Sequence, residues 1–310
     1  MSDHVAHALA GVGGGVVSLF LTYPLVTISQ RLQVQKDSNS KRAYKNGRHA
    51  LRKIYKDEGV RGLYSGLNSA VFGIALTNGT YYYFYEWTKD RFKKLSKTNR
   101  PINVFESMAA SAVAGAFTVL ITNPVWVVNT RMTTRKDSLD ADPSTSSSAA
   151  KSRPAGTIET VLRILHHDGV SAFWQGVVPA LILVINPIIQ YTVFEQLRTY
   201  WRKFKKLGNF DFFLLGAISK LAATGLTYPY IVVKSRMQLR QDDATVRYRS
   251  TLHGLREIYI HEGISGLYKG ITSKLLQSVL TAAFLFMCKE ALFEFTVSLL
   301  TKIRARKITN

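Results

Sequence analysis

The chain of 310 residues carries a formal net charge of +21, and 46% of its residues are hydrophobic. A nucleic-acid-binding protein of this charge would carry basic stripes on soluble modules, whereas this sequence repeats apolar stretches of about the length that crosses a bilayer. The mean hydropathy of +0.01 is typical of amphipathic helices around a watery pathway. Composition therefore argues against nucleic acid as a partner and favours a membrane protein.

Six long helices are predicted in chain order, over residues 4–35, 68–90, 102–133, 178–199, 209–238 and 272–295. Short helical stretches such as RHALRKIYK and TLHGLREIY precede even-numbered helices and predict surface helices. Residues 134–157 are rich in Ser, Asp, Ala and Pro, which predicts a disordered insertion after the third long helix. We therefore expect an all-α membrane protein.

The odd-numbered helices share a first signature. Three segments align without gaps: TYPLVTISQRLQ at 22–33, TNPVWVVNTRMT at 122–133 and TYPYIVVKSRMQ at 227–238. In each, a proline is followed seven residues later by an arginine, as Pro24 with Arg31, Pro124 with Arg131 and Pro229 with Arg236. A proline inside a helix removes a hydrogen bond and kinks the helix. We expect three kinks at one depth that narrow the floor of a cavity.

A second signature of acid, glycine, six residues and glycine follows each first one: DEGVRGLYSG at 57–66, HDGVSAFWQG at 167–176 and HEGISGLYKG at 261–270. The chain thus repeats the order long helix, surface helix, long helix. This predicts three repeats, over residues 1–100, 101–206 and 207–310, with 134–157 as an insertion in the second.

The two signatures together cover essentially the whole chain and resemble those of the mitochondrial carrier family. The resemblance implies six transmembrane helices in three pseudo-symmetric pairs around a central cavity, and alternating access by a monomer. In the family the pattern P-x-(D/E)-x-x-(K/R) supplies a ring of ion pairs that closes the inner gate. This chain departs from it, with Val26, Trp126 and Ile231 at the acidic position and Ser29, Asn129 and Lys234 at the basic position.

We expect Val26, Trp126 and Ile231 to form an apolar plug at the inner gate, because exposed ion pairs contribute only about 0–1 kcal/mol and a narrow apolar constriction excludes water. Trp126 is interpreted as gate packing, and stacking on a nucleotide base is the alternative. The segments YEWTK and FEQLR match the family's outer-gate pattern. They predict that Glu86 with Lys89, and Glu195 with Arg198, pair across helices; isolated surface pairs are the alternative.

Four segments resemble the peroxisomal branch of the family: YYYFYE at 81–86, INPIIQYTVFEQLR at 185–198, GAISK at 216–220 and SKLLQSVLTAAFLF at 273–286. That branch carries adenine nucleotides or, in some members, coenzyme A, NAD and FAD. The resemblance therefore predicts a peroxisomal carrier that exchanges ATP, ADP and AMP. A carrier of coenzyme A, NAD or FAD, in peroxisomes or in the mitochondrial inner membrane, is the alternative, and a membrane scaffold without transport is a third hypothesis.

Lysines inside a bilayer are costly unless they face a cavity, so Lys220 and Lys274 are predicted to bind the anionic, nucleotide-like substrate, with Gln277 one turn from Lys274. The resemblance places the family's substrate contacts at Gly73, Leu183, Val184 and Gln277. Asn78 and Asn186 are polar residues within spans. They bind substrate or bond a neighbouring helix, and the sequence leaves both roles open.

Basic residues gather in the two loops on the side of the termini: Lys89, Arg91, Lys93 and Lys94, then Arg202, Lys203, Lys205 and Lys206. They are interpreted as anchors on anionic lipids. In the peroxisomal branch such clusters are linked with targeting, so YWRKFKKLGNF is the predicted address for the peroxisomal membrane-protein import machinery. There is no Walker loop, H-E-x-x-H motif or Cys/His metal cluster, so we expect no enzyme, no cofactor and no metal site.

Overall fold

The computed structural model describes residues 2–35, 44–95, 103–139, 156–239, 248, 250–281 and 284, without the side chains of 2–14, 95, 135–139 and 209–210. Its elements are α1 Ser2–Val34, α2 Gly47–Leu63, α3 Leu67–Leu95, α4 Val104–Leu139, α5 Thr157–Asp168, η2 Val170–Trp174, α6 Val177–Ile182, η3 Leu183–Ile185, α7 Asn186–Arg202, α8 Asn209–Met237 and α9 Thr251–Leu267. Residues 271–281 are also helical.

Two of the predicted long helices differ from the observed ones. The third extends as α4 to Leu139, so the first residues of the predicted insertion are helical, while 140–155 lie outside the described residues. The fourth is divided into α6, the 3₁₀ turn η3 and α7. Pro187 lies at the start of α7, and its missing N–H leaves the preceding turn without an α-helical hydrogen bond. The sixth is described only as far as residue 281 and at 284.

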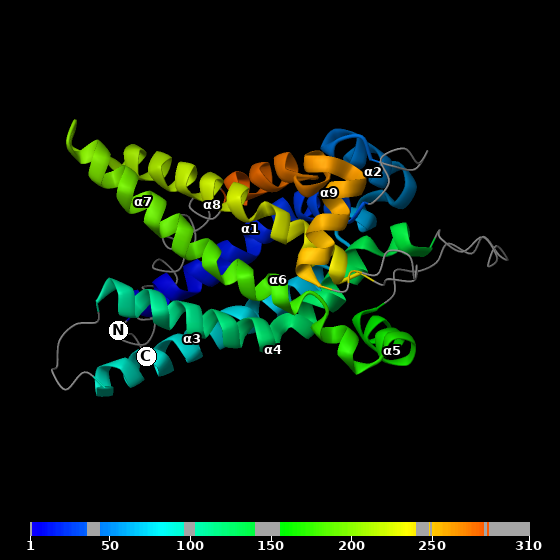
Figure 1. Cartoon of the computed structure of the whole chain (residues 1–310), viewed down its shortest axis with the longest axis horizontal. Helices are drawn as coiled ribbons and strands as arrows, with labels where there is room; N and C mark the ends of the chain where they lie inside the picture. Colours follow the sequence, from blue (N-terminus) through cyan, green and yellow to red (C-terminus); the bar gives the residue numbers. More distant parts are fainter. Residues whose placement is uncertain are drawn as a thin grey trace, which may run out of the picture.

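The long helices form an elongated bundle with two different ends (Figure 1). The surface helices α2, α5 and α9 gather at the end where α1, α4 and α8 terminate, which we call the proline end. The C-terminal ends of α3 and α7 lie at the opposite end, which we call the outer end. Helices α3 and α4 lie side by side, as do α7 and α8.

Buried apolar residues form three small clusters, one in each repeat, rather than one central core. Each cluster joins a proline-containing helix to the surface helix of its own repeat: Ile28 and Leu32 with Ile54, Val127 and Val128 with Ile164, and Val232 and Val233 with Ile258. A barrel around a cavity has no central core to fill. The sequence repeat therefore recurs as a packing unit at the proline end.

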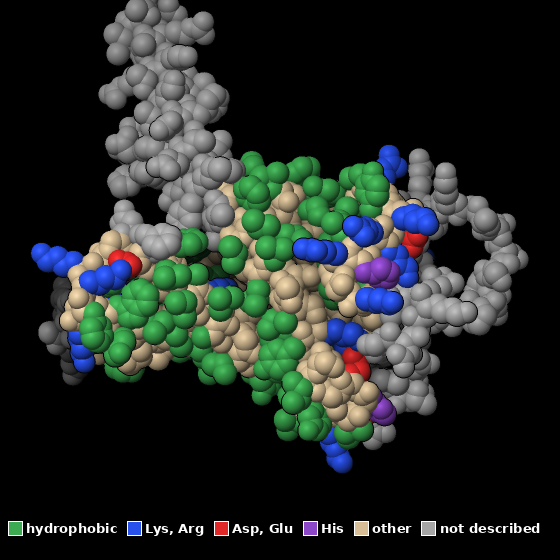
Figure 2. Space-filling view, turned by 90° about the horizontal axis from the view of Figure 1, so that it is seen from above, with side chains coloured by type: hydrophobic (Ala, Val, Ile, Leu, Met, Phe, Trp, Pro, Cys, Tyr) green, Lys and Arg blue, Asp and Glu red, His purple; other side chains and the backbone are tan. Residues whose placement is uncertain are grey.

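Apolar side chains cover the middle of the outer surface, while Lys and Arg gather toward its ends (Figure 2). This distribution suits a helix bundle that crosses a bilayer. In the described part of the chain, Val104–Thr134 and Val170–Arg202 are long and apolar enough to span a membrane by length and composition. Helices α1, α3 and α8 have 33, 29 and 29 residues and are also long enough to cross a bilayer.

Candidate functional site

The glycines of the second signature turn the chain at each surface helix. All six have positive φ values, between 66° and 81°: Gly59, Gly66, Gly169, Gly176, Gly263 and Gly270. A side chain at these φ values would be strained, so glycine is required. The acidic residue before the first glycine of each pair ends up against the arginine of the first signature.

Those arginines form a ring of hydrogen bonds that closes the proline end. Within each repeat the guanidinium pairs with the acid of the surface helix, as Arg31 with Glu58, Arg131 with Asp168 and Arg236 with Glu262. The Nε atom donates to a carbonyl of another repeat, from Arg31 to Thr133 at 3.0 Å, Arg131 to Gln238 at 3.1 Å and Arg236 to Gln33 at 3.0 Å. Each repeat is therefore bonded to the next around a closed ring.

The sequence analysis assigned no partner to these arginines. The recurrence of one acid and one arginine in all three repeats is the signal that indicates the pairing. The ion pairs are buried, since the side chains of Arg31 and Arg236 are 2% and 1% exposed. On α9, burial raises the pKa of Glu262, but Arg236 and Lys269 outweigh burial and hold that pKa below its ordinary value.

The residues before the three prolines strengthen the same end. Tyr23 donates to the Ser65 carbonyl at 3.0 Å, and Tyr228 donates to the Lys269 carbonyl at 3.0 Å. Asn123 in the middle repeat reaches the equivalent Gln175 carbonyl at 3.2 Å and also that of Phe173 at 2.8 Å. These bonds tie each odd helix to the turn before an even helix, and the sequence analysis did not identify them.

Pro24, Pro124 and Pro229 lie inside α1, α4 and α8 as predicted. A proline leaves the carbonyl four residues earlier without its helical donor. For Pro124 this carbonyl is that of Leu120, and the indole N–H of Trp174 donates to it at 3.1 Å.

Two of the predicted inner-gate residues are held by neighbouring polar groups. Ser29 accepts a hydrogen bond from Gln33 at 3.1 Å, and Asn129 donates to the Gly66 carbonyl at 2.9 Å and to Ser69 at 3.0 Å. Both are 1% exposed. The closure at this level therefore includes hydrogen bonds that the apolar-plug prediction did not foresee.

The three residues predicted to form the apolar plug are all half-buried. Trp126 donates its indole N–H to Thr77 on α3 at 3.1 Å, and Ile231 packs against the cluster around Val232. Trp126 is therefore bonded to α3, and Ile231 belongs to the apolar packing of the third repeat. A joint seal with Val26 stays a prediction.

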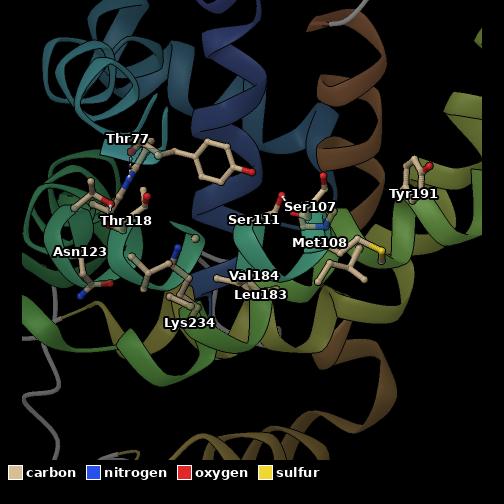
Figure 3. A pocket seen from close by; sticks show the side chains of 18 of the residues that line it. Thr77, Ser107, Met108, Ser111, Thr118, Asn123, Leu183, Val184, Tyr191 and Lys234 are labelled. Carbon is tan, nitrogen blue, oxygen red and sulfur yellow. Dashed lines mark hydrogen bonds between the residues drawn. The ribbon is translucent and has the colours of Figure 1, made fainter. Parts of the chain in front are cut away.

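A cavity of about 650 Å³ lies among the long helices, and Figure 3 shows the side chains that line it. Its wall comes from α3 and α4 and from the α6–α7 segment, with apolar and hydroxyl side chains. The lining residues are Thr77, Tyr81, Val104, Ser107, Met108, Ser111, Gly115, Thr118, Val119, Thr122, Asn123, Trp126, Ala180, Leu183, Val184, Pro187, Ile188, Tyr191 and Lys234. Lys234 is the one charged side chain among them. The cavity size falls in the usual range for small-molecule sites.

Two of the four residues predicted from the family's contact positions line this cavity. Leu183 and Val184 line it, and Val184 also packs against Gly115, where a Cβ would lie 2.6 Å from its Cγ1. Gly73 packs against the Trp126 side chain, since a Cβ there would lie at ordinary contact distance, 3.5 Å, from the indole ring. Gln277 donates to Thr281 at 3.1 Å, while its Oε1 is buried and has no partner in the described part of the chain.

The two predicted substrate lysines are not among the residues that line this cavity. Lys220 is exposed and Lys274 is half-buried. The charge of Lys274 repels that of Lys220, and the charges of Lys234 and Lys274 also repel each other. The third repeat thus brings three cations into one region of the bundle.

The two asparagines have different surroundings. Asn186 donates to Thr227 at 2.6 Å and to the Ala223 carbonyl at 3.2 Å, both on α8, so it has the interhelical role that the sequence left open. Asn78 is exposed and is not among the residues that line the cavity.

The predicted outer-gate pairs form within single helices, not across helices. Glu86 and Lys89 are 3.2 Å apart on α3, and Glu195 and Arg198 are 3.0 Å apart on α7. Residues three apart are neighbours on one helix face. Each acid can therefore pair with the basic residue of its own helix when the outer ends of the helices are separated. The cross-helix pairing is therefore wrong for this conformation.

No group of His, Cys, Asp and Glu suited to a metal ion occurs among the described residues.

Comparison with known proteins supplies a family. The chain matches the family described as mitochondrial carrier protein three times, over residues 2–96, 100–205 and 205–298. It is 38% identical to the peroxisomal nicotinamide adenine dinucleotide carrier of Arabidopsis thaliana, over 94% of this chain and 96% of that protein. Identity to the peroxisomal membrane protein PMP47B of Candida boidinii is 37%, over 94% and 86%. Identity to mouse PMP34 is 33%, over 96% and 95%.

Proposed function

This chain belongs to the mitochondrial carrier family, and we propose that it exchanges adenine-containing nucleotides, with NAD as the leading substrate. It is a multi-pass protein of the peroxisomal membrane, like the relatives to which it is similar. The family consists of transport proteins. The proposed activity is therefore transport of the substrate across the membrane without a chemical reaction.

The observation that carries the proposal is the division of the binding region into two chemically different sides. One side presents Trp126, Leu183 and Val184 with the hydroxyls of α4, which suits a flat heteroaromatic ring. On the other side Lys234 lines the cavity, and we propose that Lys220 and Lys274 add their charges there to hold phosphate groups. A nucleotide has both parts in one molecule.

NAD is placed first because the similar protein of Arabidopsis thaliana is named for it. The exchange of ATP for AMP or ADP, predicted from the resemblance to the peroxisomal branch, is the second candidate. The same cavity suits it, since adenine and phosphates are common to both. Coenzyme A and FAD share these groups as well and belong in the same test.

Exchange requires that the two ends open in turn. In this conformation the arginine ring closes the proline end, and the outer-gate charges pair within their own helices. We propose that a monomer alternates between this state and one in which the ring is open. The loop YWRKFKKLGNF remains the proposed address for the peroxisomal import machinery.

The test is reconstitution of the purified full chain in liposomes, with uptake of labelled NAD measured against internal NAD, AMP, ADP, ATP, coenzyme A, FAD or buffer. Uptake driven by NAD or an adenylate, and absent with buffer, is the expected result. Uptake of labelled ATP only against adenylates would favour the second candidate. No uptake of any nucleotide would overturn the proposal and favour the scaffold hypothesis.

A further inference from the structure

The arginine ring joins the three repeats in pairs, and one bond is common to all three junctions. At each junction an arginine Nε donates to the carbonyl that lies nine residues after the proline of another repeat, at Thr133, Gln238 or Gln33. The side-chain hydrogen bonds beside this common bond differ. The junctions therefore differ in the groups that must separate when the proline end opens.

The junction between the first and second repeats is held by several residues. Ser65 donates to the Met132 carbonyl at 2.8 Å. Asn129 donates to the Gly66 carbonyl at 2.9 Å and to Ser69 at 3.0 Å. Because these bonds come from both repeats, the loss of one side chain leaves others in place.

The junction between the third and first repeats is also held by several residues. Arg236 donates through Nη2 to the Gln35 carbonyl at 3.0 Å, and Lys269 donates to the same carbonyl at 2.9 Å. Ser235 donates to Oε1 of Gln33 at 3.0 Å. This junction too keeps bonds when one side chain is lost.

The junction between the second and third repeats depends on Gln238. Between described residues, every hydrogen bond that crosses this junction at the proline end involves Gln238. Its carbonyl accepts from Arg131 at 3.1 Å, and its Oε1 accepts from Thr130 at 3.0 Å. Its Nε2 donates to Asn123 at 3.5 Å, which is long for a hydrogen bond. One residue, 2% exposed, therefore holds this junction.

Close packing does not compensate for this difference, because it is similar at the three junctions. A Cβ added at Gly66, Gly176 or Gly270 would lie 2.8, 3.1 or 3.0 Å from a side chain of another repeat. The hydrogen bonds therefore decide which junction separates most easily.

The junction at Gln238 also borders the cavity. Asn123 on α4 accepts the bond from Gln238, and Lys234 on α8 lies one turn before Gln238. Both residues line the cavity (Figure 3). Asn186 of α7 donates to Thr227 of α8, so the two repeats have a second connection away from the proline end. A molecule in the cavity therefore lies against both sides of this junction.

We propose that Gln238 controls the first step of opening at the proline end: the second and third repeats separate at Gln238, and the other two junctions open afterwards. The inference concerns the opening step of the proposed exchange and rests on that function. The first step breaks bonds to one residue only, while each other junction must release several.

The experiment measures distances between pairs of spin labels on the surface helices of the purified full chain in liposomes, without substrate. The only cysteine, Cys288, is first replaced by serine. Labels are then attached at cysteines introduced at Lys56, His166 and Ile260, two at a time. These positions are exposed and equivalent in the three repeats. Each pair reports one junction.

The main variant is Gln238→Met, which keeps the length of the side chain and removes its hydrogen bonds. We expect the population with a longer distance between His166 and Ile260 to rise about threefold or more, because the loss of a neutral hydrogen bond shifts an equilibrium by about this factor. The other two distances should stay as in the wild type.

Gln33→Met is the same substitution at the equivalent position of the first repeat and serves as the control. Arg236 and Lys269 still donate to the Gln35 carbonyl in this variant, so the junction between the third and first repeats should stay closed.

Thr130→Val tests the junction from the second repeat, since valine has the shape of threonine without the hydroxyl donor. It should separate the same junction as Gln238→Met, and it carries the test if Gln238→Met does not fold. Wild-type distances in both variants would overturn the inference. Equal separation at all three junctions in either variant would overturn it too.

The distance measurement distinguishes this inference from the proposed function. Selective separation at Gln238 in a protein that exchanges no nucleotide would support the role of Gln238 and overturn the proposed function. Nucleotide exchange by a protein whose distances do not respond to Gln238→Met or Thr130→Val would support the proposed function and overturn the role of Gln238.

Discussion

The proline end and the cavity differ in symmetry. At the proline end every repeat contributes the same groups, an arginine, an acid and a polar residue before the proline, and the bonds run from each repeat to another. Around the cavity the repeats contribute different groups. The wall on α3, α4 and α6–α7 carries apolar and hydroxyl side chains, while α8 contributes the charged residue Lys234.

This difference assigns separate tasks to the two regions. Breaking one bond of the ring releases only one junction between repeats, so all three bonds must break for the proline end to open. A cavity with unlike walls can hold the two unlike ends of a single molecule. Mutations at the proline end should therefore affect stability and closure, and mutations around the cavity should affect binding and exchange.

The largest expected effect comes from opening the ring. Arg236→Ala removes the pair with Glu262 and the bonds to the Gln33 and Gln35 carbonyls, so that Glu262 keeps only its pair with Lys269. We expect the free energy of unfolding to fall by about 3–5 kcal/mol. Thermal unfolding of the purified protein in detergent measures this change.

The matched control is Arg163→Ala on α5, where the side chain is 43% exposed and pairs with Glu159 of the same helix. An exposed pair contributes about 0–1 kcal/mol, so this variant should unfold close to the wild type. Equal unfolding temperatures for Arg236→Ala and Arg163→Ala would contradict the assigned role of the ring.

The second largest effect is expected on exchange, at the other region. Lys274→Ala and Lys220→Ala each remove one ammonium group that we assign to phosphate. Loss of one charge-assisted hydrogen bond corresponds to about 1.5–3 kcal/mol, or roughly 10–100-fold in affinity. Nucleotide exchange should fall by that factor while thermal unfolding is unchanged, and wild-type exchange in either variant would remove that lysine from the site.

The sequence predicted the parts of the molecule that repeat, because repetition reveals equivalent positions. Arg31, Arg131 and Arg236 stood out for this reason, and so did the glycine pairs with positive φ. Their partners were missed because the pairing depends on how each surface helix folds back. The separations from arginine to acid are 27, 37 and 26 residues, so spacing alone does not indicate it.

Non-repeating positions were harder to predict. Asn186 and Asn78 look alike in the sequence, yet one bonds α8 and the other is exposed. Which face of a helix meets its neighbour is decided by packing, not by residue type. The division of the fourth predicted helix at η3 was missed too, although Pro187 was a visible reason for it.

A third, smaller effect tests the packing of the cavity wall. Gly115→Ala would place its Cβ 2.6 Å from Val184 Cγ1, so α4 and η3 must move apart. Overpacking of this kind costs about 1–3 kcal/mol. Gly216→Ala on α8 is the control, since its Cβ would meet nothing within 4 Å. The double variant with Val184→Ala should recover stability, and failure to recover would show that the two side chains do not compete for this space.

The fourth test separates two roles of Trp126. Trp126→Phe keeps an apolar ring but loses the hydrogen bond to Thr77, and should cost about 0.5–1.5 kcal/mol in unfolding free energy with little change in leak. Trp126→Ala also removes the apolar bulk and should raise unidirectional efflux from liposomes. Unchanged efflux in Trp126→Ala would end the prediction of an apolar plug at the inner gate.

The smallest effect on stability is expected at the outer end. Glu86→Gln and Glu195→Gln each break an ion pair between neighbours on one helix, which contributes about 0.3–0.5 kcal/mol, so thermal unfolding should barely change. Nucleotide exchange is the informative measurement. These charged residues can pair with residues of other helices only when the outer ends of the helices meet. Slower exchange in both variants at unchanged stability would show that the outer end closes through these charges. Wild-type exchange in both variants would show that these two pairs are surface pairs and not part of an outer gate.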